Sequence, residues 1–265
     1  MTCSSGTAAL HLSLLAIDLK SGESVYVTPN SYEACRNSVR YVSAIPINNF
    51  SGDTNIIVHN YGYVSYPVTS CGITIEDCAE ALGSCYQGKR VGTFGALSVF
   101  SFYGNKTLTT GEGGMVCTNN RAYALKVRHL KNQAMIEPYI HDQVGYNYRM
   151  TNLQAAIGCA QLERIAELIE KKVKITSFYR SLLDLESFIP LDKDYLLAGA
   201  ANVLWMNAFH VQSSYQFRLY MESQGIETRP GFNPSSDIVL LPSGTTLTEE
   251  DIKYVCDRAN KFKAS

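Results

Sequence analysis

The sequence predicts an α/β fold with a mostly parallel central sheet covered by helices, followed by a small C-terminal α+β domain. Three observations lead to this prediction. Short apolar, β-branched runs recur in the first half of the chain, helical patterns lie between or after them, and the pattern changes after about residue 172. The runs are apolar throughout instead of alternating, which is typical of strands buried on both faces of a sheet.

The expected elements follow one another in a regular order. Strands are expected at 24–28, 55–60, 73–77, 96–102 and 114–118. Helical periodicity occurs at 7–17, at 121–130 and over the longer range 151–172. The long helix opens with Thr151 and Gln154 in capping-box spacing. Its apolar face is formed by Leu153, Ala156, Ile157 and Ala160.

The region after the long helix predicts the smaller domain. Residues 202–211 are expected to form a strand, and 216–224 and 247–262 to form helices, with Thr248 as the N-cap of the last one. We therefore place a large domain at 1–168 and a small C-terminal domain at 169–265.

Composition narrows the classes of function. The chain has 265 residues, of which 46% are hydrophobic and 18% charged, and its net charge is −1. That length buries a substantial core, and the lack of a basic excess argues against nucleic acid and membranes as partners. The longest early apolar stretch, 8–17, is too short and interrupted to span a bilayer.

The eight cysteines indicate reduced thiols. They lie at positions 3, 35, 71, 78, 85, 117, 159 and 256, with no C-x-x-C pair and no clustered histidines, so a metal site is not expected. The start of the sequence shows no signal-peptide pattern. A cytoplasmic protein is therefore expected.

Two segments offer groups suited to an anionic or a ring-shaped ligand. Ser4–Thr7 stand directly before a predicted helix, where free N–H groups and hydroxyls form an anion site, or where a serine simply caps the helix. Asp77 ends a predicted buried strand, at the edge where ligands of α/β sheets gather. Its carboxylate either holds a protonated ring nitrogen or caps a helix beginning at Cys78.

Lys106 lies in the Gly/Thr-rich turn of FSFYGNKTLTTGEGGMV, five residues after Ser101. An odd separation points two side chains of a strand to opposite faces, so the two converge only if the chain turns between them, as Gly104 permits. Next to a desolvated pocket a lysine becomes a nucleophile that forms Schiff bases. The alternative is an ordinary solvated lysine.

Two further segments carry polar groups with open roles. HDQVGYNYRMTNLQAA (141–156) presents Asn147 and Arg149, either in a polar loop or on a surface that contacts a ligand or a subunit. GIETRPGFNP (225–234) offers Arg229 in a rigid turn, which is an exposed arginine unless a ligand lies beside it.

Taken in order, these segments resemble the sugar aminotransferases of the DegT/DnrJ/EryC1/StrS family, which are pyridoxal-phosphate enzymes of fold type I. The resemblance runs from Ser4 to about Lys172 and resumes at NVLWM, GIETRP and LPSGTTLTEEDIKYV. The block FSFYGNKTLTTGEGGMV is highly specific. Together with EDCAEALGS, it is most similar to the subgroup of GDP-perosamine synthases.

The resemblance implies roles for the groups that touch the cofactor ring. Lys106 would bind pyridoxal 5′-phosphate as a Schiff base and later carry a proton between cofactor and sugar. Asp77 would pair with the pyridinium nitrogen, Tyr32 would stack on the ring, and Glu80 would lie beside its phenolic oxygen. Catalysis is thus assigned to Lys106 and Asp77.

It also implies how the phosphate and the substrate are held. Ser101, Gly6 and Thr7 would bind the 5′-phosphate, and Asn147 would reach it from the neighbouring subunit of a homodimer with active sites at the subunit interface. Weaker candidates for substrate or interface are His141, Arg149 and Arg229.

The implied reaction transfers an amino group from L-glutamate to C4 of a nucleotide-linked 4-keto-6-deoxy sugar, with GDP-4-keto-6-deoxymannose giving GDP-perosamine. Compared with the family pattern, little sequence precedes SGTAAL, and the chain is shorter between 50 and 77 and around 232–244. These differences leave the sugar and nucleotide contacts open. The alternatives are an aminotransferase for a dTDP- or UDP-linked keto sugar, or a non-catalytic relative that binds pyridoxal phosphate or a nucleotide sugar.

Overall fold

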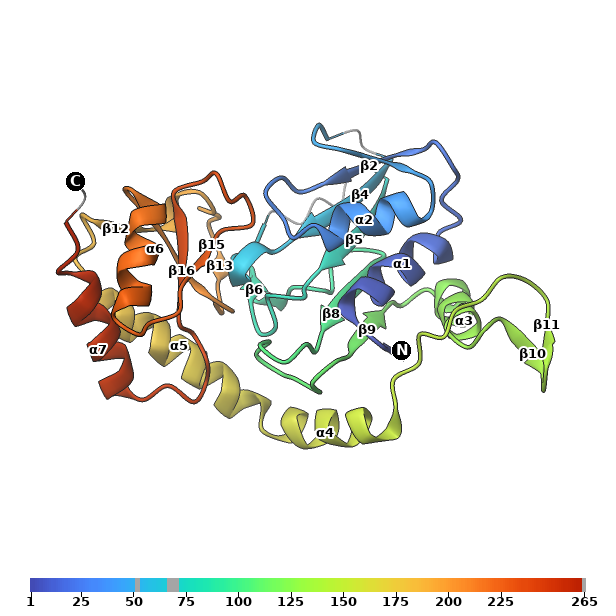
Figure 1. The fold of residues 1–265 in the computed structure, drawn as a ribbon. Coiled ribbons are helices and arrows are strands. Elements are labelled where there is room, and N and C mark those ends of the chain that lie inside the picture. The colour runs from blue at the N-terminus through green and yellow to red at the C-terminus, as the bar shows by residue number, and fades with distance from the viewer. Residues whose placement is uncertain (51–52, 66–71, 264–265) are drawn as a thin grey trace.

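A computed structural model describes residues 1–50, 53–65 and 72–263 (Figure 1). Cys71 and part of the shortened segment between 50 and 77 lie outside these ranges. The cysteines within them are all free thiols. Among the described helices, none has the length and apolar character needed to cross a membrane.

The central sheet of the first half confirms the expected α/β fold. Its strands lie in the order β1-β9-β8-β5-β4-β2-β3. All neighbouring pairs are parallel except those that β9 makes with β8 and β1. The strand bounds are β1 (Thr2–Cys3), β2 (Ser24–Val27), β3 (Ile45–Ile47), β4 (Thr54–Val58), β5 (Ile73–Asp77), β8 (Leu97–Ser101) and β9 (Gly114–Cys117).

Helices cover one face of this sheet and irregular segments cover the other. Helix α1 (Gly6–Ala16) packs on β8 and β9 between α2 (Ala34–Tyr41) and α3 (Arg121–Leu130), and α2 was not predicted from the sequence. Val99 joins the core beneath these helices, whereas its neighbour Phe100 packs on the opposite face. That second face is covered by loops, the 3-10 turn η1 (Asn60–Gly62) and a small sheet of β6 (Cys85–Tyr86), β7 (Lys89–Arg90) and β13 (Ala200–Ala201).

The predicted helix 151–172 is wrong as a single element. Two helices form instead, α4 (Asn152–Glu163) and α5 (Ile165–Leu182), and they meet at an angle in Figure 1. The chain bends at Arg164, whose N–H donates to Gln161 O at 3.1 Å and whose side chain pairs with Glu167. The predicted capping box of Thr151 and Gln154 is confirmed.

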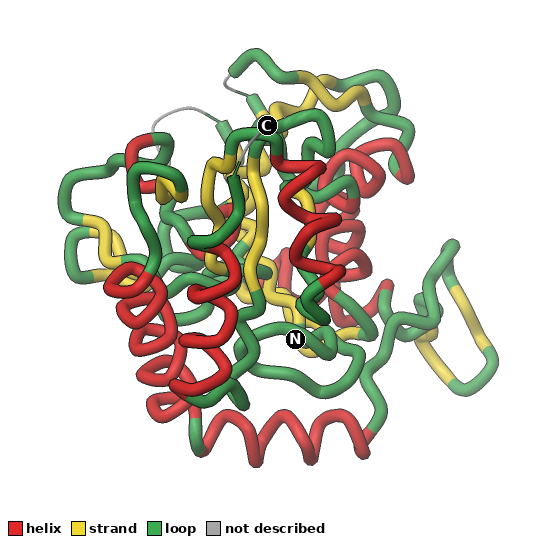
Figure 2. Tube along the Cα trace, turned by 60° about the vertical axis from the view of Figure 1, so that its left-hand side comes forward, coloured by secondary structure: helices red, strands yellow, loops and turns green. Residues whose placement is uncertain are grey.

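The two helices differ in how they are packed. Helix α5 continues to Leu182 because it buries a stripe formed by Leu168, Lys172, Ile175 and Tyr179. Helix α4 buries no residue, and the hairpin of β10 (Met135–Glu137) and β11 (Ile140–His141) projects from the body just before it (Figures 1 and 2).

A second, antiparallel sheet forms the C-terminal part, in the order β12-β14-β16-β15. Its strands are β12 (Phe188–Pro190), β14 (Asn207–Val211), β15 (Arg229–Pro230) and β16 (Ile238–Leu241), with the 3-10 turn η2 (Leu191–Lys193) after β12. Together with α5, α6 (Ser214–Ser223) and α7 (Glu249–Ala259), it encloses a separate core that includes Phe188, Phe209 and Phe217.

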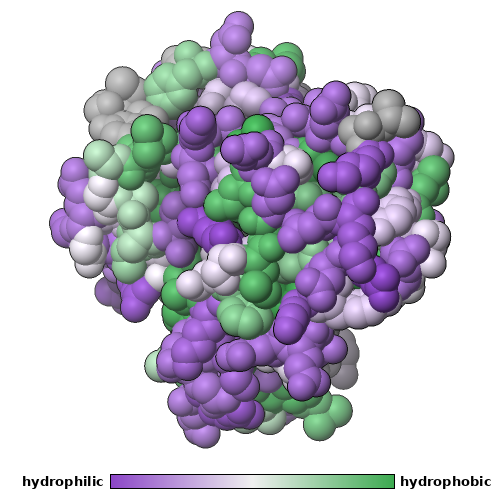
Figure 3. All heavy atoms as spheres, turned by 90° about the vertical axis from the view of Figure 1, so that its left-hand side faces the viewer, coloured by the Kyte–Doolittle hydropathy of each residue, from purple (hydrophilic) through white to green (hydrophobic). Residues whose placement is uncertain are grey.

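Thr248 caps α7, as predicted. Viewed from the side of the C-terminal part, the surface of the molecule is mostly hydrophilic, with hydrophobic side chains gathered in a strip near the centre of the view (Figure 3). The expected domain boundary at 168/169 falls inside α5, and the division itself stays a prediction.

The two sheets meet where the turn η1 touches residues 202–206. These residues were expected to begin a strand, but β14 starts only at Asn207, because the preceding segment bonds to η1 instead. The Trp205 N–H donates to Tyr61 O at 2.8 Å. Gly62 has a φ of +103°, and a Cβ added there would lie 2.6 Å from Leu204 Cα. Glycine is therefore required for this close approach.

Candidate active site

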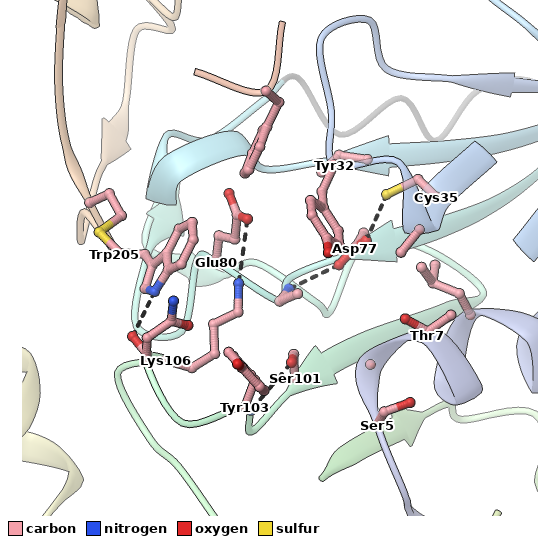
Figure 4. A pocket seen from close by; sticks show the side chains of 18 of the residues that line it. Ser5, Thr7, Tyr32, Cys35, Asp77, Glu80, Ser101, Tyr103, Lys106 and Trp205 are labelled. Carbon is pink, nitrogen blue, oxygen red and sulfur yellow. Dashed lines mark hydrogen bonds and ion pairs between the residues drawn. The ribbon is translucent and has the colours of Figure 1, made fainter. Parts of the chain in front are cut away.

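A cavity of about 520 Å³ lies at the carboxyl ends of β4, β5 and β8, where the C-terminal sheet faces the central one (Figure 4). Ligands of open α/β sheets bind at this edge. Eight predicted site residues line the cavity: Gly6, Thr7, Tyr32, Asp77, Glu80, Ser101, Lys106 and Arg229. Residues from five separate stretches of sequence thus meet in one place.

Asp77 ends β5 and is 4% exposed. One oxygen, Oδ1, accepts from the Ala79 N–H at 3.0 Å, and the Cys35 thiol donates to Oδ2 at 3.2 Å. Burial and the neighbouring Asp77 carboxylate raise the pKa of the Cys35 thiol well above its usual value, so the thiol keeps its proton as a donor. The helix considered at Cys78 does not form, and residues 79–83 make turns. The carboxylate therefore caps a turn and still lines the cavity.

Lys106 reaches the cavity because the chain turns after β8, as Gly104 was expected to permit. Its N–H donates to Tyr103 O at 2.9 Å, and its Nζ lies 3.4 Å from Glu80 Oε1 and 3.7 Å from the centroid of the Trp205 ring. The lysine side chain is 12% exposed, so the solvated alternative is wrong.

Glu80 is held opposite this lysine. Its Oε2 accepts from the Tyr61 N–H at 2.7 Å. Burial raises the pKa of Glu80, whereas the charge of Lys106 and the hydrogen bond from Tyr61 oppose that rise. The ion pair between Glu80 and Lys106 therefore holds the lysine amine at a fixed position inside the cavity.

The start of α1 forms an open cradle beside β8. Ser5 is the N-cap, and its Oγ accepts from the Ala8 N–H at 3.1 Å, so the capping alternative holds for this residue. Gly6 and Thr7 line the cavity. A Cβ added to Gly6 would lie 2.9 Å from Ser101 Cβ, so glycine brings the helix terminus close to the serine hydroxyl. Free N–H groups and a hydroxyl at a helix N-terminus suit a phosphate.

Aromatic rings and one arginine form the outer wall. Tyr32 is 60% exposed, and its ring centroid lies 5.6 Å from that of Phe232. Arg229 lines the same cavity, and its Nε and a terminal guanidinium nitrogen donate to Glu227 Oε1 at 3.0 and 2.9 Å. The Arg229 side chain is 55% exposed, as the alternative of an exposed arginine expected, and it also lines the cavity.

Three predicted residues lie outside the cavity. Asn147 forms an isolated bridge with Asn132, and His141 Nδ1 donates to Gln133 O at 2.7 Å. His141 ends the β10–β11 hairpin, Asn147 and Arg149 follow it, and all three are exposed. Within one chain they do not join the other site residues.

The structure also places residues in the cavity that the sequence did not single out. These include Cys35, Trp205 and Phe232. Trp205 is the only tryptophan of the chain and stands in the NVLWM segment, which was noted only as part of the resemblance. Nothing in the sequence pattern indicates that its ring lies against Lys106.

Comparisons with known proteins agree with the geometry. The profile of the DegT/DnrJ/EryC1/StrS aminotransferase family matches residues 1–49 and 71–237. A GDP-perosamine synthase of Escherichia coli O157:H7 is 36% identical over 98% of this chain and 85% of its own length. A UDP-4-amino-4,6-dideoxy-N-acetyl-beta-L-altrosamine transaminase of Campylobacter jejuni is 31% identical over 66% of this chain and 55% of its own length.

The fold has solved counterparts as well. Helicobacter pylori PseC, an aminotransferase involved in the biosynthesis of pseudoaminic acid, superimposes with a TM-score of 0.87 at 22% identity. That match covers 98% of this chain and 85% of the other.

Proposed function

The chain belongs to the DegT/DnrJ/EryC1/StrS aminotransferase family, and from this premise we propose that it transfers the amino group of L-glutamate to C4 of a nucleotide-linked 4-keto-6-deoxy sugar. Members of the family are pyridoxal-phosphate-dependent sugar aminotransferases, and so is this protein. We further propose GDP-4-keto-6-deoxymannose as the acceptor and GDP-perosamine as the product. The observation that carries the proposal is the meeting of Lys106, Asp77 and Glu80 in one cavity.

The residues of the cavity fit pyridoxal phosphate. Lys106 would bind it covalently, Asp77 would face its ring nitrogen, and the cradle of Gly6, Thr7 and Ser101 would hold its phosphate. The support is the space that Gly6 leaves beside Ser101 and the buried carboxylate at the end of β5. When bound, the cofactor supplies an electron sink for the carbon that loses a proton.

The side chains of this protein then bind, orient and move protons. Lys106 Nζ takes a proton from the α-carbon of the amino donor and later delivers one to C4 of the sugar. Glu80 keeps that amine oriented through its carboxylate, at 3.4 Å. Asp77 would place its carboxylate opposite the ring nitrogen, and its two oxygens accept from the Ala79 N–H and the Cys35 thiol.

We also propose a homodimer in which Asn147 completes the phosphate site of the neighbouring subunit. The support is a set of exposed apolar side chains in the stretch of sequence around Asn147. Tyr139 is 92%, Val144 77% and Leu153 81% exposed. Exposed apolar side chains gathered on one surface are typical of interaction sites. The cytoplasmic location stays a prediction.

A second candidate is an acceptor linked to UDP or dTDP. The similarity to the Campylobacter jejuni transaminase, which is named for a UDP-linked sugar, favours the UDP-linked acceptor. The groups around Lys106 act on the keto carbon and the amine, so they do not distinguish one nucleotide from another.

The test is to incubate the protein with pyridoxal phosphate, L-glutamate and a panel of GDP-, dTDP- and UDP-linked 4-keto sugars, and to detect the amino sugar by mass spectrometry. We expect amination of the GDP-linked sugar. Amination of another member instead would favour the second candidate. No amination across the panel would show that the proposed function is wrong.

A further inference from the structure

The amine of Lys106 lies between two different surfaces. On one side is the Glu80 carboxylate, 3.4 Å from Nζ, and on the other is the face of the Trp205 ring, 3.7 Å away (Figure 4). We propose that Trp205 is a positioning residue for Lys106, which fixes both ends of the lysine side chain. The inference rests on the proposed function only in taking Lys106 as the amine that binds the cofactor.

The ring fixes the amine end of the side chain. A cation above the face of an indole is attracted by the negative face of the π-system, most strongly where water is excluded. Trp205 is 6% exposed, so the contact is shielded from solvent. A ring face adds no second carboxylate beside the amine, so the ion pair with Glu80 is not duplicated from this side.

The indole N–H fixes the backbone end. Trp205 Nε1 donates to the carbonyl oxygen of Asn105 at 2.8 Å, and Asn105 is the residue directly before Lys106. One side chain from the C-terminal half thus holds the turn that carries the lysine and also the tip of that lysine. Phenylalanine in place of Trp205 would keep a ring near the amine but lose this hydrogen bond.

The tryptophan is itself held by groups from two other elements. The backbone N–H of Trp205 donates to Tyr61 O at 2.8 Å, and its backbone carbonyl oxygen accepts from Lys172 Nζ at 2.8 Å. Lys172 is 2% exposed and also donates to Ser243 O. Burial, and secondly the charge of Lys106, lowers the pKa of Lys172 to about 8. The backbone of Trp205 is therefore anchored to both η1 and α5, which leaves the ring little freedom to move away from the amine.

The contact can be read directly, because Trp205 is the only tryptophan. We expect Lys106→Met to shift the fluorescence emission maximum of the cofactor-free full chain, since the charge over the ring is lost. Lys106→Arg keeps a cation there and should leave the maximum close to that of the wild type. The matched control is Lys126→Met, which removes a lysine paired with Asp18 far from the cavity and should cause no shift. Equal emission from the Met and Arg variants at position 106 would overturn the contact.

The positioning role is tested by the rate at which pyridoxal phosphate attaches to Lys106, measured by borohydride trapping and peptide mass spectrometry. We expect Trp205→Leu to slow attachment on the order of tenfold, and Trp205→Phe to restore part of that loss. Phe217→Leu truncates a buried ring of the C-terminal core, outside the cavity, and should leave the rate unchanged.

Attachment at the wild-type rate in Trp205→Leu would overturn the inference, and so would equal rates in the Leu and Phe variants. Circular dichroism shows which variants are folded, and the variants at position 106 leave Trp205 itself intact. Neither measurement needs a sugar substrate. Failure of the sugar panel in an otherwise normal protein therefore counts against the proposed function alone.

Discussion

The residues that the family resemblance singled out lie in two regions. The two regions differ in how many of their contacts are made within one chain. The cavity brings Lys106, Asp77 and Glu80 together within one chain, each with hydrogen-bond partners in the same chain. The surface of α4 and the β10–β11 hairpin leaves Asn147 and the apolar face of α4 exposed to solvent. The groups proposed to handle protons thus come from one chain, whereas in the proposed dimer the second region is completed by another copy.

The largest effect is expected where the cavity is most self-contained. Lys106→Ala removes both the covalent attachment and the proton carrier, so we expect the rate of amino transfer to fall by about 10³-fold or more. Product formation is followed by mass spectrometry. Lys126→Met is the control and should retain full activity. Normal turnover in Lys106→Ala would show that the role proposed for Lys106 is wrong.

Asp77→Asn should have the next largest effect. The amide keeps the size of the carboxylate but loses the charge opposite the ring nitrogen, and we expect kcat to fall by roughly 10²–10³-fold. Asp194→Asn, in the C-terminal part, provides a charge-matched control. Unchanged kcat in Asp77→Asn would mean that the carboxylate serves only the turn at Ala79.

Mixing two inactive variants compares the two regions directly. Lys106→Ala and Asn147→Ala should each be inactive alone. If Asn147 acts across the interface, a mixed dimer contains one intact site, so statistical mixing should recover about a quarter of wild-type activity. Activity is measured after co-refolding or co-expression of the two variants. No recovery, or full activity of Asn147→Ala alone, contradicts the shared site.

Leu153→Asp tests whether the exposed face of α4 is an interface. Leu153 is 81% exposed, so we expect the stability of the single chain to change by less than about 0.5 kcal/mol while the dimer dissociates. Sedimentation velocity gives the mass. Leu196→Asp is a close match, because Leu196 is 84% exposed but lies elsewhere. Dissociation in both variants, or in neither, would argue against a specific interface at α4.

The smallest effect lies away from both regions, at His210. Burial lowers its pKa, but hydrogen bonds to Asp237 and Asp194 outweigh burial and raise the pKa above the usual 6.5. The stabilisation is therefore complete below pH 6.5 and is lost as the pH rises through the raised value. Because His210 and its two aspartate partners are partly exposed, we expect them to contribute less than about 1 kcal/mol to the free energy of unfolding. The contribution is measured by denaturant unfolding of the wild type and of His210→Asn between pH 5 and 9. If the free energy of unfolding of the two proteins changes with pH in parallel, the prediction is wrong.

The sequence predicted the parts of the fold that local pattern determines. The apolar runs became β2, β4, β5, β8 and β9, and the helix at 121–130, the capping box of Thr151 and Gln154 and the N-cap Thr248 were confirmed. The bend at Arg164 was missed because the hydrophobic periodicity continues through it. Helix α2 was missed because it has only eight residues, too few for its one buried face of Cys35, Ser38 and Val39 to be recognised as a helical pattern.

The part of the site that lies in short, specific sequence motifs was predictable from the sequence. Lys106 and Ser101 came from one specific block of sequence and Asp77 from another, and all three line the cavity. The neighbours that orient them were not predictable. Cys35 lies 42 residues from Asp77, and Trp205 lies 100 residues from Asn105, so no local spacing relates them. The first pair is set by how α2 lies on the central sheet and the second by how the two sheets meet, and periodicity encodes neither.

The close approach at Gly62 has a consequence for how the protein is made. The turn that carries Tyr61 and Gly62 and the strand end that carries Asp77 leave the ribosome well before the segment of Trp205 that packs against that turn. Synthesis proceeds at roughly 5–20 residues per second, so about 100 residues between Lys106 and Trp205 amount to a delay on the order of 5–20 s. Throughout that interval the nascent chain carries its reactive lysine without the tryptophan that holds it. The newly made protein therefore acquires the two ends of its cavity at different times.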